Sequence, residues 1–428
     1  MVKSHFIASF LVILFLPLAY LGSSATTTTA GTPDGSEIWG YIEVRPKTHM
    51  FWWYYKSPYA PQHPNNPWPL ILWLPGGPGV PGGVVNFGGV GPLDFFLKPT
   101  NLTWLKKADL LFVDNPVGSG YSYVEDEELL AKTDEEVATD LITLLTQVFN
   151  KYQTFQKKPL YIVGWSYGAK FAATLGLLAL KAIENNKLKL ILGGIVLADG
   201  YISPEDYVVS WGPLLKDVSR IDENGLIESN SVVKKIKQQI ANGNWKAAEQ
   251  SWNDLVQAIH AYSNSVDLLN FLLDDPGSNF SAIESLMNGV IRNKLKIIPN
   301  TKKWTVLSPL ISDNMAGDFM KPRINEVDEL LKKGVNVTIY NGQLDVICAT
   351  IGTEAWVKKL KWEGLETYLS MNRTPIYCAD ENVTKGFRKS YKNLDFFWIL
   401  GAGHNAYQDQ PCVTFNMIGD ITRGLATF

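Results

Sequence analysis

The sequence predicts an α/β fold in which a mostly parallel central sheet is flanked by helices and carries a helical insertion. Short apolar runs alternate with longer amphipathic segments along most of the 428 residues, as in strands joined by crossover helices. Between residues 205 and 304 this alternation stops, because polar residues dominate and apolar residues recur at helical spacing. We therefore expect two core parts, residues 26–204 and 305–428, separated by a helical cap at residues 205–304.

Each expected element follows from its residue pattern. Strands are expected at Ile38–Val44, Met50–Tyr55, Leu70–Leu74, Leu110–Val113, Leu160–Val163, Gly193–Leu197, Asn336–Tyr340 and Phe396–Leu400. Helices are expected at Glu135–Tyr152, Ala169–Asn185, Val232–Ile240, Trp245–Ala261 and Val327–Lys333. The first two strands have the pattern of a hairpin, and the third is apolar enough to be buried on both faces.

The first 25 residues have the order of a cleaved signal peptide. Lys3 and His5 precede a mostly apolar run from Phe6 to Leu21, and small residues up to Ala25 follow. A membrane anchor is the alternative, but a run interrupted by Pro17 is short for a bilayer span of about 20 residues. We predict the secretory pathway, with the mature protein secreted or in a vacuole or lysosome and without a stable membrane anchor.

Export also permits glycosylation and disulfide bonds. Five Asn-x-Ser/Thr sequons are predicted glycosylation sites: Asn101, Asn279, Asn336, Asn372 and Asn382. The chain has three cysteines, and we predict a disulfide between Cys378 and Cys412 with Cys348 left as a buried thiol. Three reduced cysteines in the core are the alternative.

Charge and spacing argue against several other classes of protein. The formal net charge of −3 gives no electrostatic reason to expect a nucleic acid or an anionic membrane as partner. A phosphate loop is not indicated, because Gly164–Lys170 is too short and Gly76–Gly79 lacks a following Lys-Ser or Lys-Thr pair. We expect no metal site and no cofactor. The expected partner is a peptide or a small acyl substrate, and the oligomeric state stays open.

The segment Gly164-Trp165-Ser166-Tyr167-Gly168 lies between a predicted strand and a predicted helix. This is the context of a nucleophile elbow, whose tight turn needs glycines because larger side chains would collide with the adjacent strand and helix. It predicts an α/β-hydrolase fold with Ser166 as the nucleophile.

A serine hydroxyl needs a base to take its proton and a carboxylate to orient that base. His404 follows a predicted strand in the small-residue loop Gly401-Ala402-Gly403-His404, whereas His5, His49 and His63 precede the serine and His260 lies in the insertion. Asp345 follows another strand and lies between Ser166 and His404, which is the chain order of these hydrolases. A surface histidine and a turn-capping aspartate are the alternatives.

The developing oxyanion needs backbone donors. The glycine-rich loop after Leu70–Leu74 lets its backbone approach a substrate, and we assign one donor to the N–H of Gly77. The second donor is the N–H of Tyr167, directly after the nucleophile.

These residues, in this order, resemble the serine carboxypeptidase family, and within it the retinoid-inducible and plant serine carboxypeptidase-like branch. The likeness covers nearly the whole mature chain and includes Trp39-Gly40-Tyr41, the stretches from Leu72 to Gly79, Val113 to Tyr123 and Tyr340 to Asp345, Gly401 to His404, and Asp409-Gln410-Pro411. The resemblance implies an α/β-hydrolase with a helical insertion and activity favouring acid pH. It also implies release of C-terminal residues from peptides.

Three positions depart from the family pattern. Trp165 replaces a Glu that helps to bind the terminal carboxylate, Pro75 replaces Asn or Gln before the two glycines, and Asn405-Ala406-Tyr407 replaces Met-Val-Pro. We expect Gly76, Trp165 and Asn405 to line the substrate pocket. Loss of two carboxylate contacts at about 1.5–3 kcal/mol each would lower kcat/KM by roughly 10²- to 10⁴-fold.

Three hypotheses follow. The leading one is an exported serine carboxypeptidase-like hydrolase that releases C-terminal residues through an acyl-enzyme on Ser166. The second keeps the same residues but uses them for acyl transfer or ester cleavage. The third is a binding homologue that has lost turnover because Trp165 and Pro75 replace the carboxylate-binding residues.

Overall fold

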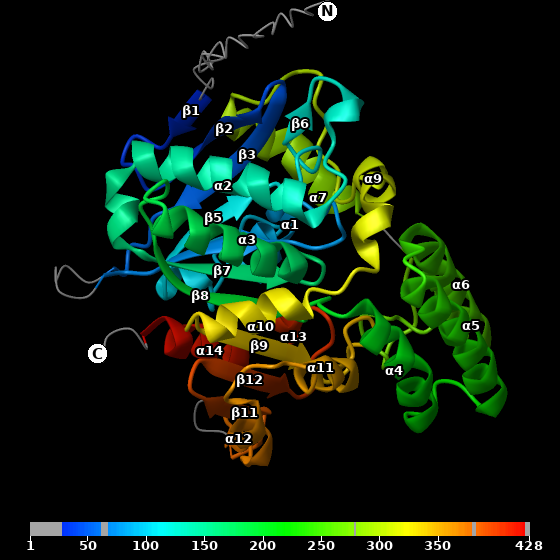
Figure 1. Ribbon diagram of the computed structural model, residues 1–428. Coiled ribbons are helices and arrows are strands. Elements are labelled where there is room, and N and C mark those ends of the chain that lie inside the picture. Colours follow the sequence, from blue (N-terminus) through cyan, green and yellow to red (C-terminus); the bar gives the residue numbers. More distant parts are fainter. Residues whose placement is uncertain (1–27, 61–66, 278–279, 379–381, 424–428) are drawn as a thin grey trace, which may run out of the picture.

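The computed structural model describes residues 28–60, 67–277, 280–378 and 382–423. The predicted signal peptide lies outside these residues. The strands are β1 Thr28–Gly31, β2 Glu37–Arg45, β3 Thr48–Tyr55, β4 Leu70–Leu74, β5 Asp109–Val113, β6 Tyr123–Val124, β7 Pro159–Trp165, β8 Ile191–Ala198, β9 Val337–Gly342, β10 Thr374–Ile376, β11 Gly386–Tyr391 and β12 Leu394–Ile399. All of them belong to one sheet, which crosses the molecule in Figure 1.

Helices lie on both faces of this sheet. They are α1 Gly82–Val85, α2 Asp134–Lys151, α3 Gly168–Glu184, α4 Pro204–Asp217, α5 Glu223–Ala241, α6 Trp245–Ser263, α7 Ser281–Leu286, α8 Arg292–Leu295, α9 Pro309–Phe319, α10 Ile324–Lys332, α11 Thr350–Val357, α12 Leu365–Ser370, α13 Ala406–Asp409 and α14 Pro411–Arg423. Apolar side chains of α2, α3, α10 and α11 pack on one face of the sheet, and those of α1, α7, α8 and α14 pack on the other.

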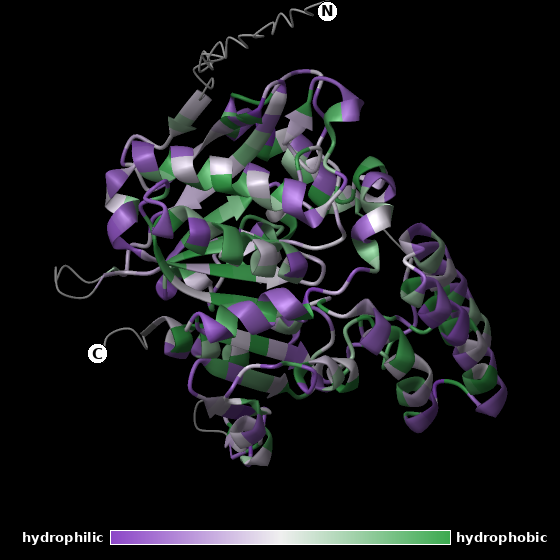
Figure 2. Cartoon of the chain, in the orientation of Figure 1, coloured by the Kyte–Doolittle hydropathy of each residue, from purple (hydrophilic) through white to green (hydrophobic). Residues whose placement is uncertain are grey.

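The centre of the sheet is parallel, as expected from the alternation of strands and helices. Its order is β5-β4-β7-β8-β9-β12, and each neighbouring pair in this run is parallel. Antiparallel strands extend it at both ends. Figure 2 shows the central strands as largely hydrophobic, in keeping with burial on both faces. Because the central strands are parallel, their carboxyl ends lie along one edge of the sheet, where ligand sites of such folds gather.

The described residues of the predicted insertion fall into two parts. Helices α4, α5 and α6 form a lobe beside the sheet with its own apolar cluster, which includes Trp211, Ile236 and Leu255 (Figure 1). The stretch after α6, with Ile283 and Met287, packs instead on the cluster that covers one face of the sheet. Amphipathic spacing predicts both kinds of helix equally, because it shows which face is apolar and not what covers that face.

The antiparallel strands at one edge of the sheet were not expected from the sequence. β11 reads Gly-Phe-Arg-Lys-Ser-Tyr and pairs with β12, and the short β10 pairs with β11. Charged residues are common on such strands, since they discourage pairing with another chain, and they weaken the apolar signal of the strand. The C-terminal helix α14 was also not expected.

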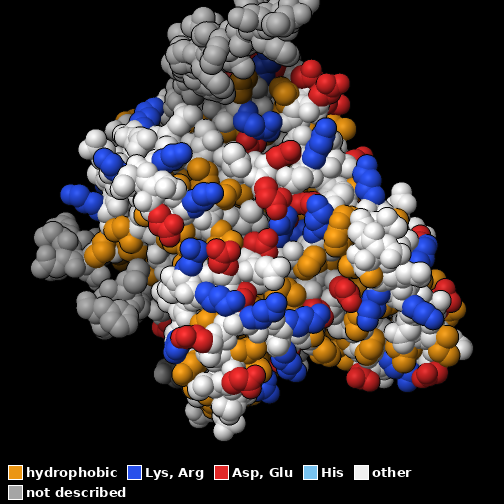
Figure 3. All heavy atoms as spheres, viewed as in Figure 1, with side chains coloured by type: hydrophobic (Ala, Val, Ile, Leu, Met, Phe, Trp, Pro, Cys, Tyr) orange, Lys and Arg blue, Asp and Glu red, His pale blue; other side chains and the backbone are white. Residues whose placement is uncertain are grey.

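A disulfide joins Cys378, beyond β10, to Cys412 at the start of α14, and Cys348 is a buried free thiol. Four of the five predicted glycosylation sites have exposed side chains: Asn101, Asn336, Asn372 and Asn382. The fifth, Asn279, lies outside the described residues. On the face drawn in Figure 3, basic and acidic side chains are interspersed. Among the described residues, no helix combines the length and the apolar character needed to cross a bilayer.

Asp114 anchors the loop that follows β5. Its Oδ1 accepts a hydrogen bond from the N–H of Gly82 at 2.8 Å, and its Oδ2 accepts one from the N–H of Tyr121 at 2.8 Å. The carboxyl is fully buried, and this burial raises the pKa of Asp114 to about 7. The folded protein therefore binds a proton here that the unfolded chain, with an ordinary aspartate, has lost.

We expect the contribution of Asp114 to the free energy of unfolding to fall as the pH rises from about 4 to about 7, because in this range its carboxyl holds more protons in the folded state than in the unfolded state. The stability that is lost over this pH range because of Asp114 is on the order of 4 kcal/mol. The free energy of unfolding, measured by urea titration at several pH values, should fall less steeply with pH in Asp114→Asn than in the wild type. An unchanged dependence on pH would contradict the assignment to Asp114.

Candidate active site

Ser166 lies in a strained turn between β7 and α3. Its φ of 57° is in the left-handed region, which is costly for a residue other than glycine. A Cβ on Gly164 would collide with the carbonyl of Gly168, and one on Gly168 would collide with the carbonyl of Leu74. These contacts explain both glycines of the elbow. The turn leaves the Ser166 side chain half-buried at the carboxyl edge of the sheet.

His404 and Asp345 meet at the same edge. Asp345 follows β9 and His404 follows β12, and their side chains are almost fully buried. Asp345 Oδ2 accepts a hydrogen bond from His404 Nδ1 at 2.8 Å, while its Oδ1 accepts one from the N–H of Cys348 at 3.0 Å. With Nδ1 as the donor, Nε2 keeps a lone pair that can accept a proton.

The backbone around this pair is held by the segment that returns from the helical lobe. The carbonyl of Leu269 accepts a hydrogen bond from the N–H of His404 at 2.7 Å. The carbonyl of Leu268 accepts bonds from the N–H groups of Val346 and Ile347, each at 3.1 Å. This segment therefore holds both loops that carry the acid and the histidine.

Trp165 connects the elbow to His404. Its indole Nε1 donates a hydrogen bond to the backbone carbonyl of His404 at 2.8 Å, and the two ring centroids are 5.4 Å apart. No hydrogen bond joins the Ser166 hydroxyl to the imidazole in this structure. Such bonds are often long before substrate binds. The structure thus pairs His404 with Asp345 directly. Ser166 is next in the chain to Trp165, whose indole is hydrogen-bonded to His404.

The glycine loop that carries one expected oxyanion donor packs on the elbow that carries the other. A Cβ on Gly76 would lie 2.6 Å from Ser166 Cβ and 2.8 Å from the backbone nitrogen of Tyr167, so the glycine loop packs directly on the elbow. Gly77 has a φ of 105°, which favours glycine. Within the described part of the chain, neither the N–H of Gly77 nor that of Tyr167 donates a hydrogen bond. Both amides are therefore available to a developing oxyanion.

A buried network of charges holds the side chain of Tyr167. The hydroxyl of Tyr167 donates to Asp134 Oδ1 at 2.8 Å, and Lys170 Nζ donates to that hydroxyl at 3.0 Å. Arg323 donates to Asp134 at 2.8 Å and to Asp318 at 2.9 Å. Sequence reasoning missed these residues, because nothing in their spacing indicates that they converge. The network fixes the first turn of α3, where the oxyanion donor lies.

Aromatic side chains occupy the position where the resemblance implies a carboxylate-binding glutamate. The ring of Trp165 packs edge-on against Tyr407 at 5.9 Å, and Tyr407 packs in the same way against Trp73 at 5.6 Å. Pro75 is buried and Asn405 is half-buried. The indole N–H of Trp165 is already bonded to the carbonyl of His404, so it offers no free donor to a carboxylate.

One cluster of potential metal ligands occurs among the described residues, and it includes the Asp–His pair. Ligand atoms of Asp345, Cys348 and His404 lie within 4.8 Å of one another. Burial raises the pKa of the Cys348 thiol well above its usual range, which disfavours the thiolate that would bind a metal. The arrangement therefore fits proton transfer better than metal binding.

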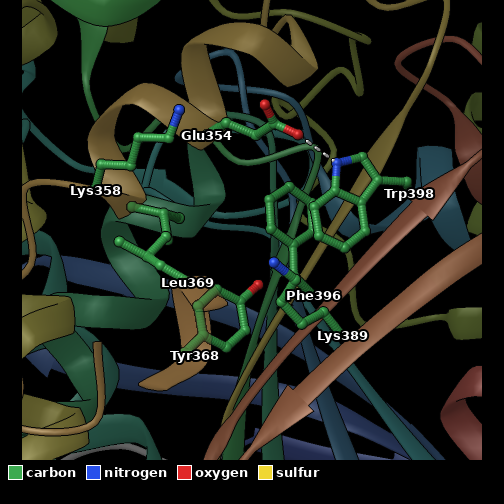
Figure 4. A pocket seen from close by; sticks show the side chains of 8 residues that line it. Glu354, Lys358, Tyr368, Leu369, Lys389, Phe396 and Trp398 are labelled. Atoms are coloured by element: carbon green, nitrogen blue, oxygen red, sulfur yellow. Dashed lines mark hydrogen bonds between the residues drawn. The ribbon is translucent and has the colours of Figure 1, made fainter. Parts of the chain in front are cut away.

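A separate cavity of about 180 Å³ lies between α11, α12, β11 and β12 (Figure 4). Its lining includes Glu354 from α11, Lys358 directly after that helix, and the rings of Phe396 and Trp398 from β12. Trp398 Nε1 donates to Glu354 Oε1 at 2.8 Å. No residue of the candidate active site lines this cavity.

The sheet order, the elbow at Ser166 and the Asp345–His404 pair at the strand ends define the class of the protein as an α/β-hydrolase. Residues 28–424 match the serine carboxypeptidase family. The chain belongs to this family.

Relatives support this assignment, and one solved structure shares the fold. Serine carboxypeptidase-like 51 of Arabidopsis thaliana is 54% identical over 97% of this chain and 98% of its own length. Retinoid-inducible serine carboxypeptidase of Homo sapiens is 40% identical over 96% of this chain and 97% of its own length. The crystal structure of Kex1(Δ)p, a prohormone-processing carboxypeptidase of Saccharomyces cerevisiae, shares the fold with a TM-score of 0.78 over 91% of each chain at 20% identity.

Proposed function

We propose that the protein is an exported serine carboxypeptidase that releases C-terminal residues from peptides through an acyl-enzyme intermediate. The observation that carries this proposal is the buried hydrogen bond from His404 to Asp345, at the same sheet edge as the strained Ser166. Membership of the serine carboxypeptidase family favours peptide hydrolysis over acyl transfer, ester cleavage or binding without turnover.

In the first half-reaction, Ser166 Oγ attacks the scissile carbonyl while His404 Nε2 takes the hydroxyl proton. Asp345 holds the imidazole in the required tautomer and stabilises the imidazolium that forms. The amides of Gly77 and Tyr167 donate hydrogen bonds to the oxyanion. His404 then gives its proton to the leaving amine, so the C-terminal residue departs with a free amino group.

In the second half-reaction, a water molecule replaces the departed residue. His404 takes a proton from this water as it attacks the acyl carbon of Ser166. The same two amides stabilise the second oxyanion. Collapse of that intermediate breaks the ester, returns the proton from His404 to Ser166 Oγ and releases the shortened peptide.

We also propose the secretory pathway as its destination, either outside the cell or in a vacuole or lysosome. The support comes from the predicted signal peptide, the exposed sequons and the disulfide between Cys378 and Cys412. The name of one relative also favours export: venom serine carboxypeptidase of Apis mellifera is 28% identical over 90% of this chain.

The exopeptidase proposal is tested with two substrates that differ at one group. A blocked dipeptide with a free C-terminus should be cleaved at least about 10-fold faster than its C-terminal amide, because recognition of the carboxylate positions the scissile bond. Equal rates would argue against an exopeptidase. Measuring kcat and KM for both substrates separates weak binding from poor positioning.

Trp165→Phe should lower kcat by about 5- to 30-fold, which corresponds to the loss of one buried hydrogen bond of about 1–2 kcal/mol. The phenyl ring keeps part of the packing against Tyr407, but nothing then donates to the carbonyl of His404. Steady-state kinetics on the blocked dipeptide check this. Tyr407→Phe is the matched control, since its ring contacts Trp165 without a hydrogen bond to His404. Equal losses in both variants would contradict the role given to the indole N–H.

A further inference from the structure

A second buried carboxyl lies beside Asp345. Asp199 follows β8, the strand between β7 and β9 in the sheet. Its Oδ1 accepts a hydrogen bond from the N–H of Gly342 at 2.7 Å, and its own N–H donates to the carbonyl of Tyr340 at 2.9 Å. Gly342 is the last residue of β9, and its carbonyl accepts a bond from the N–H of Asp345. Asp199 therefore fixes the point from which the Asp345 loop starts.

The surroundings of Asp199 disfavour a negative charge. The side chain is fully buried, it has no ion-pair partner in the described part of the chain, and its Oδ2 has no hydrogen-bond partner. The ionisable groups that interact electrostatically with it include acids, phenols and a thiol, none of which carries a positive charge: Asp345, Asp409, Tyr340, Tyr407 and Cys348. Burial, and then the charge of Asp345, raise the pKa of Asp199 well above its usual range, although the nearby amides of Gly342 and Ala406 oppose this.

Only one of two adjacent buried carboxyls keeps its charge easily, because like charges in a poorly solvated site repel each other. Asp345 faces the imidazole of His404 and accepts a second bond from the N–H of Cys348. The charge is therefore better stabilised on Asp345 than on Asp199. A negative charge on Asp199 as well would favour the protonated imidazole of His404. His404 could then not accept the proton of Ser166.

We propose that Asp199 is a positioning residue that acts as a neutral carboxylic acid, fixing the start of the Asp345 loop while leaving Asp345 as the single charge beside His404. This inference rests on the roles proposed for Asp345 and His404. It assigns to Asp199 no contact with substrate.

The test compares Asp199→Ala with Asp199→Asn in the full-length protein. The readout is the rate at which a fluorophosphonate labels Ser166, measured between about pH 4 and pH 9, because this reaction needs the base but no particular peptide. Asp199→Ala removes the acceptor of Gly342 and should slow labelling by about 10- to 100-fold. Asp199→Asn keeps a neutral acceptor of the same shape and should restore the rate to within about 3-fold, with the wild-type pH profile.

A second measurement reports protonation directly. At about pH 7, the infrared difference between wild type and Asp199→Asn should contain the C=O band of a protonated carboxyl. Asp114 also keeps part of its proton at this pH, so the band is assigned by its loss in Asp199→Asn. This measurement also shows whether Asp199 is protonated if the Asp199→Ala variant does not fold.

Three outcomes would overturn the inference. One is that Asp199→Asn is labelled as slowly as Asp199→Ala, or that the pH profile of its labelling rate is shifted. Either result would mean that the reaction needs an ionised Asp199. Another is a wild-type rate in both variants. The third is the absence of the protonated band. Failure of the roles proposed for Ser166, His404 and Asp345 looks different, because wild-type Ser166 would then not be labelled at all.

Discussion

Ser166→Ala is expected to lower kcat for release of the C-terminal residue by about 10⁴- to 10⁶-fold. The substitution removes the only atom that forms the acyl-enzyme in the proposed reaction. KM should change little, because the glycine loop and the Trp165 side chain, which we expect to line the substrate pocket, stay in place. The measurement is the time course of amino acid release from a blocked dipeptide.

The Ser166→Ala result depends on the variant being folded. Alanine at φ of 57° remains strained, so the near-UV circular dichroism and the melting temperature must match those of the wild type. A folded Ser166→Ala that retains more than about 1% of the wild-type kcat would exclude Ser166 as the nucleophile.

Asp345→Asn should lower kcat by about 10⁴-fold. Asparagine has nearly the shape of aspartate, and its oxygen can still accept the bond from the N–H of Cys348. Its amide, however, donates toward His404 Nδ1, so the imidazole carries its proton on Nε2 and can no longer act as the base. The loss should appear in kcat, with the rate of Ser166 labelling falling in parallel.

Asp409→Asn is the matched control for Asp345→Asn. Asp409 lies in the same region and accepts a hydrogen bond from the N–H of Gly403 at 2.8 Å, whereas the hydrogen bond of the imidazole is made to Asp345. Its replacement should change kcat by less than about 10-fold. A similar loss in both variants would show that the effect comes from the loop and not from the tautomer of His404.

The sequence was sufficient to predict most of the parallel core and the members of the candidate site. β7, β9 and β12 are each rich in β-branched, aromatic or other apolar residues, and Ser166, Asp345 and His404 each follow one of these strands. Parallel strands bring their carboxyl ends to one edge, so the order along the chain was enough to place these residues together.

The parts that escaped prediction depend on long-range contacts. The network of Asp134, Lys170, Asp318 and Arg323 joins segments that have no relation in sequence. Asp199 has no motif around it, and its position beside Asp345 follows only from the strand order β8-β9. Such residues become recognisable only when burial and hydrogen-bond partners are known.

Trp165 shows how the structure changes the meaning of a substitution that the sequence had revealed. Compared with the family pattern, it is a lost carboxylate-binding residue. In the structure its indole N–H donates to the carbonyl of His404, and its ring packs between His404 and Tyr407. The tryptophan therefore stabilises the loop that carries the proposed base, which a comparison of residue types could not indicate.

The measurement that tests the account most directly is labelling of the protein with a fluorophosphonate at about pH 5, followed by mass spectrometry of its peptides. We predict one label per molecule, on Ser166, with a rate that falls steeply in Asp345→Asn and no labelling in Ser166→Ala. A folded wild-type protein that is not labelled, or that carries the label on another residue, would contradict the assignment of Ser166, His404 and Asp345 as a catalytic unit.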